Sequence, residues 1–368
     1  MSTAAVMRVV VKIGTSSLTD DRGVIEDTAV IKLSAEVASL RATGNEIIVV
    51  SSGAVAAGVV AMGLEKRPTD MATLQAIAAA GQGRLMRSWD DALAAHALVP
   101  AQALLVPQDF IDRRQYLHAR RTLTRILQLG AVPIINENDA IASDEIRYGD
   151  NDRLAALVAH NMAASLLVLL TDLDGLYTAD PRKHHDATLI ASVPVDDPLL
   201  AISAGRGGSG RGSGGMASKL ESARIASWSG VPTVIANAAR PNVLAGAANG
   251  EPVGTRFEAR NRRLGARKLW IAFAARVAGS VTVDDGARRA LTERQTSLLP
   301  AGVVSVEGRF LDGDTVDVCG TDGTTFARGM VFIESAQLRK VAGMQTRDLP
   351  EGVVHEVIHR DDLVLLPS

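Results

Sequence analysis

Five short runs of Val, Ile and Leu recur along the first two thirds of the chain, and turn residues bound each of them. They occupy residues 8–13, 46–50, 132–135, 166–171 and 231–236. Runs that are apolar throughout, rather than alternating, are typical of strands whose two faces are both buried. We therefore predict a buried, mostly parallel sheet in this part of the chain.

Amphipathic segments of helical length lie between these runs. We predict helices over 28–43, 70–96, 112–129, 150–164 and 216–228, the second of them interrupted near Gly81. Because strand and helix alternate, the predicted fold is α/β, a three-layer αβα sandwich around the sheet. Ligands of such folds bind beyond the carboxyl ends of the strands, so functional residues are expected directly after each strand.

The pattern changes near residue 280, where short alternating segments replace the long apolar runs. They lie at 302–306, 315–319, 327–333, 353–358 and 363–366, between turns such as Asp-Gly and Gly-Asp. This pattern predicts a small β-barrel-like domain. A chain of 368 residues also exceeds the usual size of one domain. We predict domains at 1–258 and 279–368, joined by a basic linker at 259–278.

Composition narrows the class of protein. Hydrophobic residues make up 47% of the chain and aromatic residues only 3%, so Ala, Val, Leu and Ile must build the core. The formal net charge of -2 argues against a protein whose main task is to neutralise nucleic acid. The single cysteine, Cys319, fits a reducing cytoplasm. No run resembles a signal peptide or a transmembrane helix, so we expect a cytoplasmic protein without a membrane partner.

Polar, glycine-containing turns follow four of the predicted strands. They begin at Lys12, Ser51, Asn136 and Thr171. The stretch from Asn136 to Asp152 is dense in carboxylates and amides, and helix capping accounts for only one of them. Asn and Asp side chains at a strand end are suited to hold an α-ammonium group, which favours an amino acid as the ligand.

A glycine-rich tract at 205–215 runs directly into a predicted helix that carries Lys219. Backbone amides that end at a helix N-terminus form an anion site, although a flexible linker would have the same composition. Lys219, one turn into the helix, favours the anion site because a phosphate there would need a mobile cation. The tract does not have the spacing of a Walker A loop.

Lys12 lies within an otherwise apolar strand. Burial of an ammonium group costs several kcal/mol unless an anion accompanies it, so Lys12 is expected to have an anionic partner unless it is solvated at a sheet edge. Together with Lys219 it would supply the two positive charges that a transferring phosphoryl group requires. We expect no metal held by protein ligands alone: His355 and His359 match the H-E-x-x-H pattern, but their segment is strand-like rather than helical.

In order along the first domain, these motifs resemble those of the glutamate 5-kinase family of amino-acid kinases. The similar segments lie at 11–18, 50–55, 135–139, 148–154, 170–177 and 212–219. Segments at 283–287, 302–306 and 313–316 resemble a PUA domain, which bacterial members of the family often append. Together the resemblances cover nearly the whole chain and imply an amino-acid kinase fold followed by a PUA domain.

The resemblance implies roles for individual residues. Lys12 and Lys219 would stabilise the transferring phosphoryl group, and Asp152 would orient both. Glutamate would be bound by Ser52, Asp139, Asp150 and Asn151. Lys12 would also contact the nucleotide, which would be held by Thr171, Asp172, Ser213, Gly214, Gly215, Met216, Ala217, Ser218 and Lys219. The chain departs from the usual family sequence at Ser213 and Ser218, where Thr is common, and at Arg147, where Lys is common.

The resemblance also implies an activity: ATP and Mg²⁺ would be used to phosphorylate the side-chain carboxylate of glutamate, the first step of proline biosynthesis. Proline is implied as a feedback inhibitor, a homodimer or homotetramer as the assembly, and RNA as a further ligand of the PUA domain. Two alternatives remain. An aspartokinase or acetylglutamate kinase usually begins with Lys-x-Gly-Gly, whereas Thr15 follows Gly14 here. An RNA-binding protein with a vestigial kinase domain would not need Lys12, Asp152 and Lys219.

Overall fold

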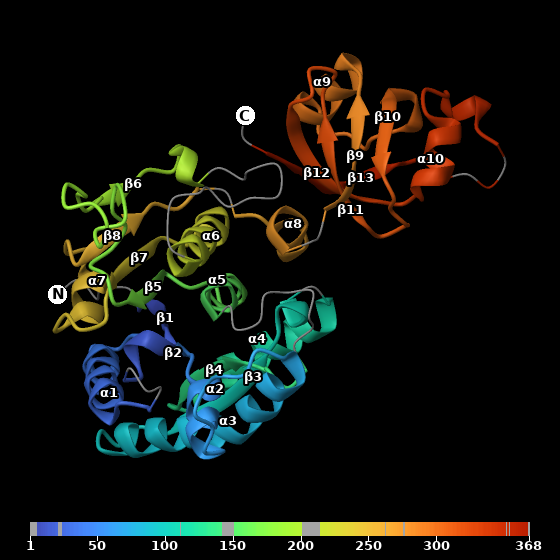
Figure 1. Cartoon of the computed structure of the whole chain (residues 1–368). Helices are drawn as coiled ribbons and strands as arrows, with labels where there is room; N and C mark the ends of the chain where they lie inside the picture. Colours follow the sequence, from blue (N-terminus) through green and yellow to red (C-terminus); the bar gives the residue numbers. More distant parts are fainter. Residues whose placement is uncertain are drawn as a thin grey trace. The chain divides into compact units, whose positions relative to one another are not determined.

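A computed structural model describes residues 6–20, 24–110, 112–141, 151–200, 214–261, 263–274, 277–350, 352 and 354–366. The chain divides into two compact units (Figure 1). The first contains the described residues up to Leu200 and those from 214 to Arg263, and the second contains those from Leu264 onward.

An eight-stranded sheet forms the centre of the first unit, with strand order β3-β4-β2-β1-β5-β7-β8-β6. Its strands are β1 (Arg8–Ile13), β2 (Glu46–Ser51), β3 (Pro100–Leu105), β4 (Val132–Glu137), β5 (Leu166–Thr171), β6 (Ser192–Val193), β7 (Thr233–Asn237) and β8 (Gly254–Phe257). Neighbours pair in parallel except β7 and β8. The five predicted strands and the mostly parallel sheet are therefore confirmed.

Three strands of this sheet were not predicted. β3 lies at one end of the strand order, and its residues are only half-buried or exposed, so it has no continuous apolar run. β6 has two residues, and β8 alternates between half-buried and buried positions over four. Short or edge strands carry little hydrophobic signal because one of their faces remains in contact with water.

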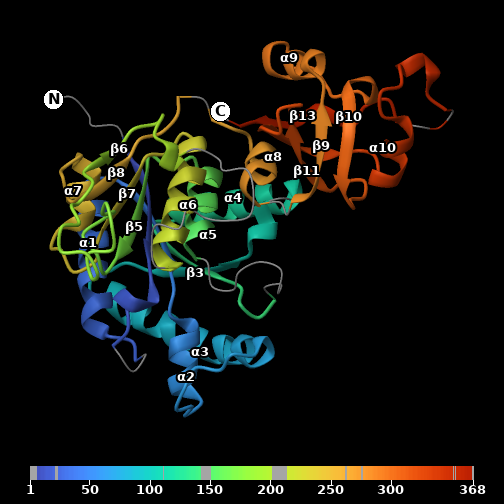
Figure 2. The ribbon, with the colours of Figure 1, turned by 45° about the horizontal axis from the view of Figure 1, so that its top comes forward.

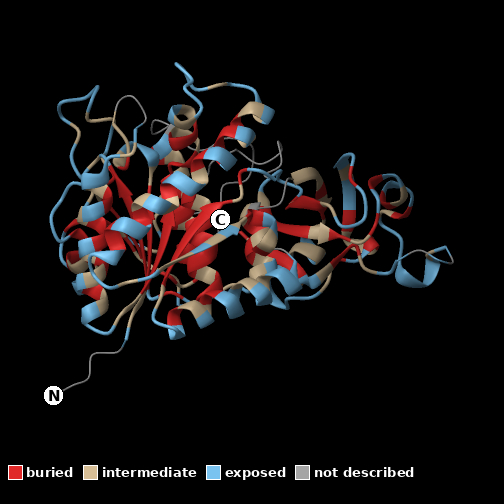
Figure 3. Cartoon of the chain, turned by 90° about the horizontal axis from the view of Figure 1, so that it is seen from below, coloured by how far each residue is buried: buried red, intermediate tan, exposed pale blue. Residues whose placement is uncertain are grey.

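Helices cover both faces of the sheet (Figure 2), which confirms the three-layer architecture. They are α1 (Asp27–Ala42), α2 (Ala54–Ala61), α3 (Met71–Ala94), α4 (Arg113–Gln128), α5 (Asn151–Asn161), α6 (Gly214–Trp228) and α7 (Val243–Asn249). α1, α3 and α7 share a hydrophobic cluster with one face, and α5 and α6 pack together with α5 against β1. Figure 3 shows the buried strands between these more exposed helices.

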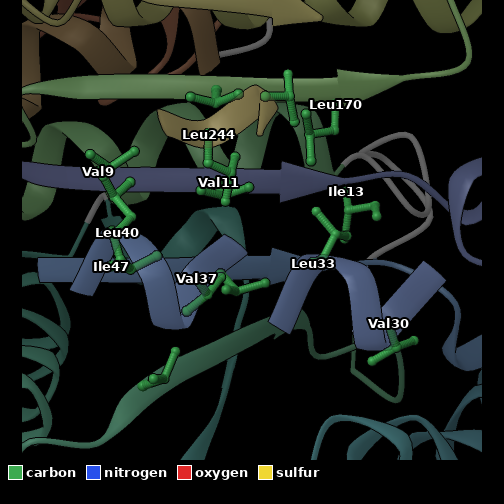
Figure 4. Packing of buried hydrophobic residues seen from close by; sticks show 14 of the residues in the cluster. Val9, Val11, Ile13, Val30, Leu33, Val37, Leu40, Ile47, Leu170 and Leu244 are labelled. Atoms are coloured by element: carbon green, nitrogen blue, oxygen red, sulfur yellow. The ribbon is translucent and has the colours of Figure 1, made fainter. Parts of the chain in front are cut away.

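Alternation along β1 decides which side chains meet which helix. Val9, Val11 and Ile13 belong to the cluster that contains the buried residues of α1 (Figure 4). Since successive side chains of a strand point to opposite faces, Val10 and Lys12 lie on the other face, which α5 covers. The strand geometry thus directs Lys12 toward the beginning of α5.

Two glycines allow α2 and α3 to cross in direct backbone contact. A Cβ atom added at Gly58 would lie 1.8 Å from the carbonyl oxygen of Ile77, and one at Gly81 would lie 2.0 Å from that of Ala54. The expected interruption of the helix near Gly81 was wrong, because α3 is continuous from Met71 to Ala94. Gly81 is required by the close approach of another helix rather than by a break in its own.

The second unit contains a mixed five-stranded sheet with strand order β10-β9-β11-β12-β13. Its strands are β9 (Val277–Val283), β10 (Val303–Gly308), β11 (Thr315–Cys319), β12 (Thr325–Val331) and β13 (Ile358–Leu365), accompanied by the helices α9 (Asp285–Glu293) and α10 (Ser335–Val341). Leu298, just before β10, forms an isolated bridge with Ile358 of β13, which curls the sheet toward a barrel. The small β-rich domain is confirmed, but the strand expected at 353–358 is wrong, because β13 begins at Ile358.

Part of the expected linker packs onto this second sheet. The short helices α8 (Ala266–Leu269) and η4 (Trp270–Ala274) precede β9. The Arg328 guanidinium donates 2.8 Å hydrogen bonds to the Asp317 carboxylate and to the carbonyl oxygen of Ala272, and Arg267 pairs with Asp362. The basic residues after 263 are therefore not only a solvated connector. The boundaries 1–258, 259–278 and 279–368 themselves stay a prediction.

Across the part of the chain that the structure describes, no helix combines the length and the apolar character that crossing a bilayer requires.

We predict that Gly81→Ala destabilises the first unit by about 1–3 kcal/mol, because the new methyl group would overlap backbone atoms of α2 that cannot move independently. Gly83→Ala is the matched control, since no atom lies within 4 Å of its added Cβ. Alanine in an open helical position should stabilise by about 0.5–1 kcal/mol. Denaturant unfolding of both variants tests this, and equal effects of the two substitutions would contradict it.

Candidate active site

The polar turns meet at one edge of the sheet, as parallel strands require. Ile13 of β1 is level with Ser51 of β2 on one side and with Leu170 of β5 on the other. The carboxyl end of β4 lies at the same edge, because Ile135 of β4 pairs with Val50 of β2. β1 thus lies where the chain switches from one half of the sheet to the other, which is the usual ligand position in such sheets.

Asp152 joins the two lysines that the sequence singled out. α5 begins at Asn151 and places Asp152 in its first turn. The Lys12 ammonium lies 2.5 Å from Oδ1 of Asp152, and the Lys219 ammonium lies 3.1 Å from Oδ2. These three residues are between 4% and 7% exposed. The cations of β1 and α6, distant in sequence, therefore converge on one buried carboxylate.

The two lysines govern the ionisation of Asp152. Burial raises the pKa of the Asp152 carboxyl, but the ammonium groups of Lys12 and Lys219 outweigh burial and hold that pKa below its ordinary value. The carboxylate is consequently ionised at neutral pH. Two ammonium groups thus lie against one carboxylate, an arrangement that gathers donor groups suited to an anionic ligand at the strand ends.

Gly14 follows β1 and lies against the Lys12 ammonium. A Cβ atom at Gly14 would lie 3.3 Å from Nζ of Lys12, closer than most side-chain contacts. A larger residue would crowd the cation and the space in front of it. The glycine of this turn therefore keeps the lysine approachable.

Buried amides and hydroxyls form a second group at the ends of β2 and β4. Nδ2 of Asn151 donates to Oγ of Ser52 at 3.0 Å and to Oδ1 of Asn136 at 2.9 Å, and its Oδ1 accepts from the Glu137 amide at 3.1 Å. Nδ2 of Asn136 in turn donates to Oε1 of Gln82 at 2.8 Å. This amide network joins α3, β4, α5 and the end of β2 through Gln82, Asn136, Asn151 and Ser52.

A third group follows β5. Oγ1 of Thr171 donates a 3.0 Å hydrogen bond to Oδ1 of Asp172, whose other oxygen pairs with Arg182. Partial burial raises the pKa of Asp172, but hydrogen bonds from its own backbone amide and from Thr171, together with Arg182, lower it overall. Asn237 at the end of β7 donates to Asp174 at 3.0 Å. Hydrogen-bonding side chains thus lie at the carboxyl ends of β5 and β7, on the opposite side of β1 from β2 and β4.

The structure brings most of the expected site residues together. Ser52 is bonded to Asn151 as described, and Asp139 lies buried two residues beyond β4. Gly214, Gly215, Met216, Ala217 and Ser218 form the first turns of α6 ahead of Lys219. Asp150 and Ser213 lie outside the described residues, as does most of the glycine tract.

Sequence reasoning gave no role to Gln82, Arg182 or the Asn136 side chain. Asn136 stood in a strand-end turn, which was the available signal. Gln82 lies in the middle of an Ala-rich helix, and Arg182 follows a proline in a loop, so no local pattern connects either to the site. Gln82 meets Asn136, which is 54 residues away, and this contact became visible only with the fold.

No cluster of three or more His, Cys, Asp or Glu side chains suited to a metal occurs among the residues that the structure describes. His355 and His359 do not share a helix, because β13 begins at Ile358 and the residues just before it are not helical. The geometry of the H-E-x-x-H zinc motif is therefore not formed.

Comparison with known proteins defines the class of the chain. The model of the amino acid kinase family matches residues 7–237, and the model of the PUA domain matches residues 279–353. Since the first match spans more than half of the chain, the protein belongs to the amino acid kinase family.

Curated relatives narrow this assignment. Glutamate 5-kinase of Mycobacterium ulcerans is 46% identical over 97% of this chain and 96% of the relative, and glutamate 5-kinase of Mycolicibacterium smegmatis is 47% identical over the same shares. Within the amino acid kinases, the chain belongs to the glutamate 5-kinase family. Among solved structures, the alignment with T. acidophilum isopentenyl phosphate kinase covers 68% of this chain and 100% of that one, at 20% identity and a TM-score of 0.49. The family assignment does not depend on it.

We predict that Asp152→Asn lowers the free energy of unfolding by about 3–5 kcal/mol at neutral pH, because it leaves two buried ammonium groups without their carboxylate. A carboxyl whose folded pKa is depressed stabilises the fold above its unfolded pKa of about 3.9, and this contribution is lost as the pH falls through the folded value. The gap between wild type and variant should therefore be constant above about pH 5 and narrow below pH 4.

Denaturant unfolding between pH 7 and pH 3 measures this gap. The control is Asp91→Asn on α3, an exposed position where no such gap is expected. A gap that is absent at pH 7, or unchanged at pH 3, would show that Asp152 does not neutralise the lysines.

Proposed function

We propose that this chain transfers the γ-phosphoryl group of ATP to the side-chain carboxylate of glutamate, giving glutamate 5-phosphate in the first step of proline biosynthesis. One observation carries the proposal: Asp152 holds two buried lysines together at the strand-end site. The names of the full-length relatives support the choice of glutamate.

The chemistry needs no general base from the protein. A glutamate carboxylate has a pKa of about 4.3, so it is ionised at neutral pH and can attack the γ-phosphorus directly. The new bond joins a carboxylate oxygen to phosphorus, the bond from phosphorus to the β,γ-bridging oxygen breaks, and ADP leaves with that electron pair. What remains for the protein is in-line positioning and positive charge.

Lys12 and Lys219 supply that charge. Both would contact oxygens of the transferring phosphoryl group, while Asp152 keeps the ammonium groups oriented and close together. Because the cluster is buried, the same charges act in a lower dielectric than water and stabilise the developing negative charge more strongly. Lys12, at the end of the central strand, would also contact the nucleotide.

The two substrates would approach from opposite sides of β1. Ser52, Asp139, Asp150 and Asn151 would bind glutamate on the side of β2 and β4. On the other side, Thr171, Asp172 and the beginning of α6 would hold the nucleotide. The N-terminus of α6 supports this assignment, because exposed backbone amides there favour phosphate. At this end of α6, the residues proposed to contact the nucleotide are Ser213, Gly214, Gly215, Met216, Ala217, Ser218 and Lys219.

Mg²⁺ is proposed as the metal of the reaction. Mg²⁺ in kinases needs only one or two carboxylates besides substrate phosphates, and Asp172, a partly exposed carboxylate directly after β5 on the nucleotide side, could supply one. When bound, Mg²⁺ neutralises phosphate charge and polarises the bond to phosphorus. No larger set of protein ligands is required.

Proposals also follow for the assembly, the cellular location and RNA binding. We propose a homodimer or homotetramer, and a cytoplasmic location, which the single cysteine Cys319 supports. RNA binding by the second unit is proposed from the match to the PUA domain alone.

We predict that the purified protein forms glutamyl hydroxamate from ATP, glutamate and hydroxylamine, and that Lys219→Ala lowers kcat by about 10²–10³. Lys66→Ala, at an exposed lysine of the same unit, is the control and should leave kcat unchanged. Turnover with aspartate or acetylglutamate but not glutamate would refute the substrate, and near-normal activity of Lys219→Ala would refute the role of the cluster.

Proline inhibition is a separate expectation. If proline occupies a site that overlaps that of glutamate, added proline should raise the KM for glutamate and leave the KM for ATP unchanged. Initial rates over a grid of glutamate and proline concentrations measure this. Glutamate kinetics that do not respond to proline would contradict the overlap.

A further inference from the structure

Helix α3 makes two hydrogen bonds to the part of the site that is proposed to bind glutamate. Oε1 of Gln82 accepts the 2.8 Å hydrogen bond from Asn136, and Nε1 of Trp89 donates a 2.9 Å hydrogen bond to Oγ of Ser51. Asn136 and Ser51 both lie at carboxyl ends of strands, in β4 and β2. α3 therefore holds the two strands that carry the residues proposed to bind glutamate.

The amide network is closed at one end by the Glu137 backbone N–H, which can only donate, and at the other by Oε1 of Gln82, which accepts from Asn136. A carboxamide has one donor end and one acceptor end, and a rotation by 180° exchanges them. Because Nδ2 of Asn136 donates to Gln82, its Oδ1 faces Asn151 and accepts one hydrogen of Nδ2 there. The other hydrogen goes to Oγ of Ser52, and Oδ1 of Asn151 accepts from the Glu137 amide.

The network ends at the Ser52 hydroxyl group, which is left to act as a hydrogen-bond donor. Oγ of Ser52 accepts from Asn151, so the hydrogen of Ser52 must point elsewhere. Ser52 is 8% exposed and lies directly after β2, which pairs with β1, the strand that carries Lys12. A buried hydroxyl that has already accepted one hydrogen bond acts as a donor to the next group it meets, and the group that suits it is an anion.

Backbone packing makes this arrangement rigid. Ser52 is followed by Gly53, which has a φ of +117°, and by Ala54, the first residue of α2. The carbonyl oxygen of Ala54 is the atom that a Cβ at Gly81 would strike at 2.0 Å. The turn after Ser52 is thus pressed against α3 one residue before Gln82, so neither end of the network can shift alone.

We propose that Gln82 is a positioning residue for the amino-acid substrate: through Asn136 and Asn151 it orients the Ser52 hydroxyl as a hydrogen-bond donor to a substrate carboxylate. This inference rests on the proposed function, because it concerns the same site. Gln82 itself touches no reacting atom. Its loss should weaken substrate binding and leave the phosphoryl transfer step nearly intact.

The test is a kinetic comparison of wild type, Gln82→Met and Gln82→Ala. Methionine has a similar size but cannot accept the Asn136 hydrogen bond, and alanine removes the acceptor without a new side chain. Both should raise the KM for glutamate about three- to tenfold, the range that one hydrogen bond supplies, with kcat and the KM for ATP within about twofold of wild type. Gln115→Met, at an exposed glutamine of α4, is the matched control.

A double-mutant cycle with Asn136→Ala separates positioning from general loss of structure. If Gln82 acts through Asn136, then Gln82→Met should have no further effect on the KM for glutamate once Asn136 is alanine. Additive effects, an unchanged KM in Gln82→Met, or an equal rise in the KM for ATP would overturn the inference. If wild type used aspartate instead of glutamate, the proposed function would fail, and the same comparison with aspartate would still test Gln82.

Discussion

Asp152 is the residue on which the site depends. Two ammonium groups cannot be buried side by side without an anion between them, because desolvation and mutual repulsion both oppose it. Asp152 meets this requirement only if α5 begins where β1 ends and α6 packs along α5, and both conditions hold in the first unit. Much of its architecture can be understood as the means of placing one carboxylate between Lys12 and Lys219.

The strand order separates the two proposed substrates. β2 and β4 lie on one side of β1 and carry Ser52 and Asn136, whereas β5 and β7 lie on the other and carry Thr171 and Asn237. Lys12 lies on the central strand between them. A phosphoryl group that passes from one side to the other would therefore cross the lysine cluster, which is where positive charge is most useful.

The sequence predicted what depends on local pattern. Continuous apolar runs identified β1, β2, β4, β5 and β7. The buried position of Lys12 and the glycine tract before Lys219 joined the two lysines into one hypothesis, and the family resemblance added Asp152. What it missed depends on remote contacts. Gly81 resembled a helix break but serves a crossing with α2, and Gln82 showed no signal because its partner, Asn136, is 54 residues away. The short strand expected at 353–358 failed because alternation over six residues does not say which neighbour pairs with them.

Both lysines are proposed to contact the phosphoryl group while it is transferred from ATP to glutamate. A crystal structure with glutamate, Mg²⁺, ADP and a fluoroaluminate mimic of that group tests it most directly. The mimic is expected between the two substrates, with Nζ of Lys12 and Nζ of Lys219 within hydrogen-bonding distance of it and with Asp152 still bound to both lysines. A mimic that contacts neither lysine would contradict the account.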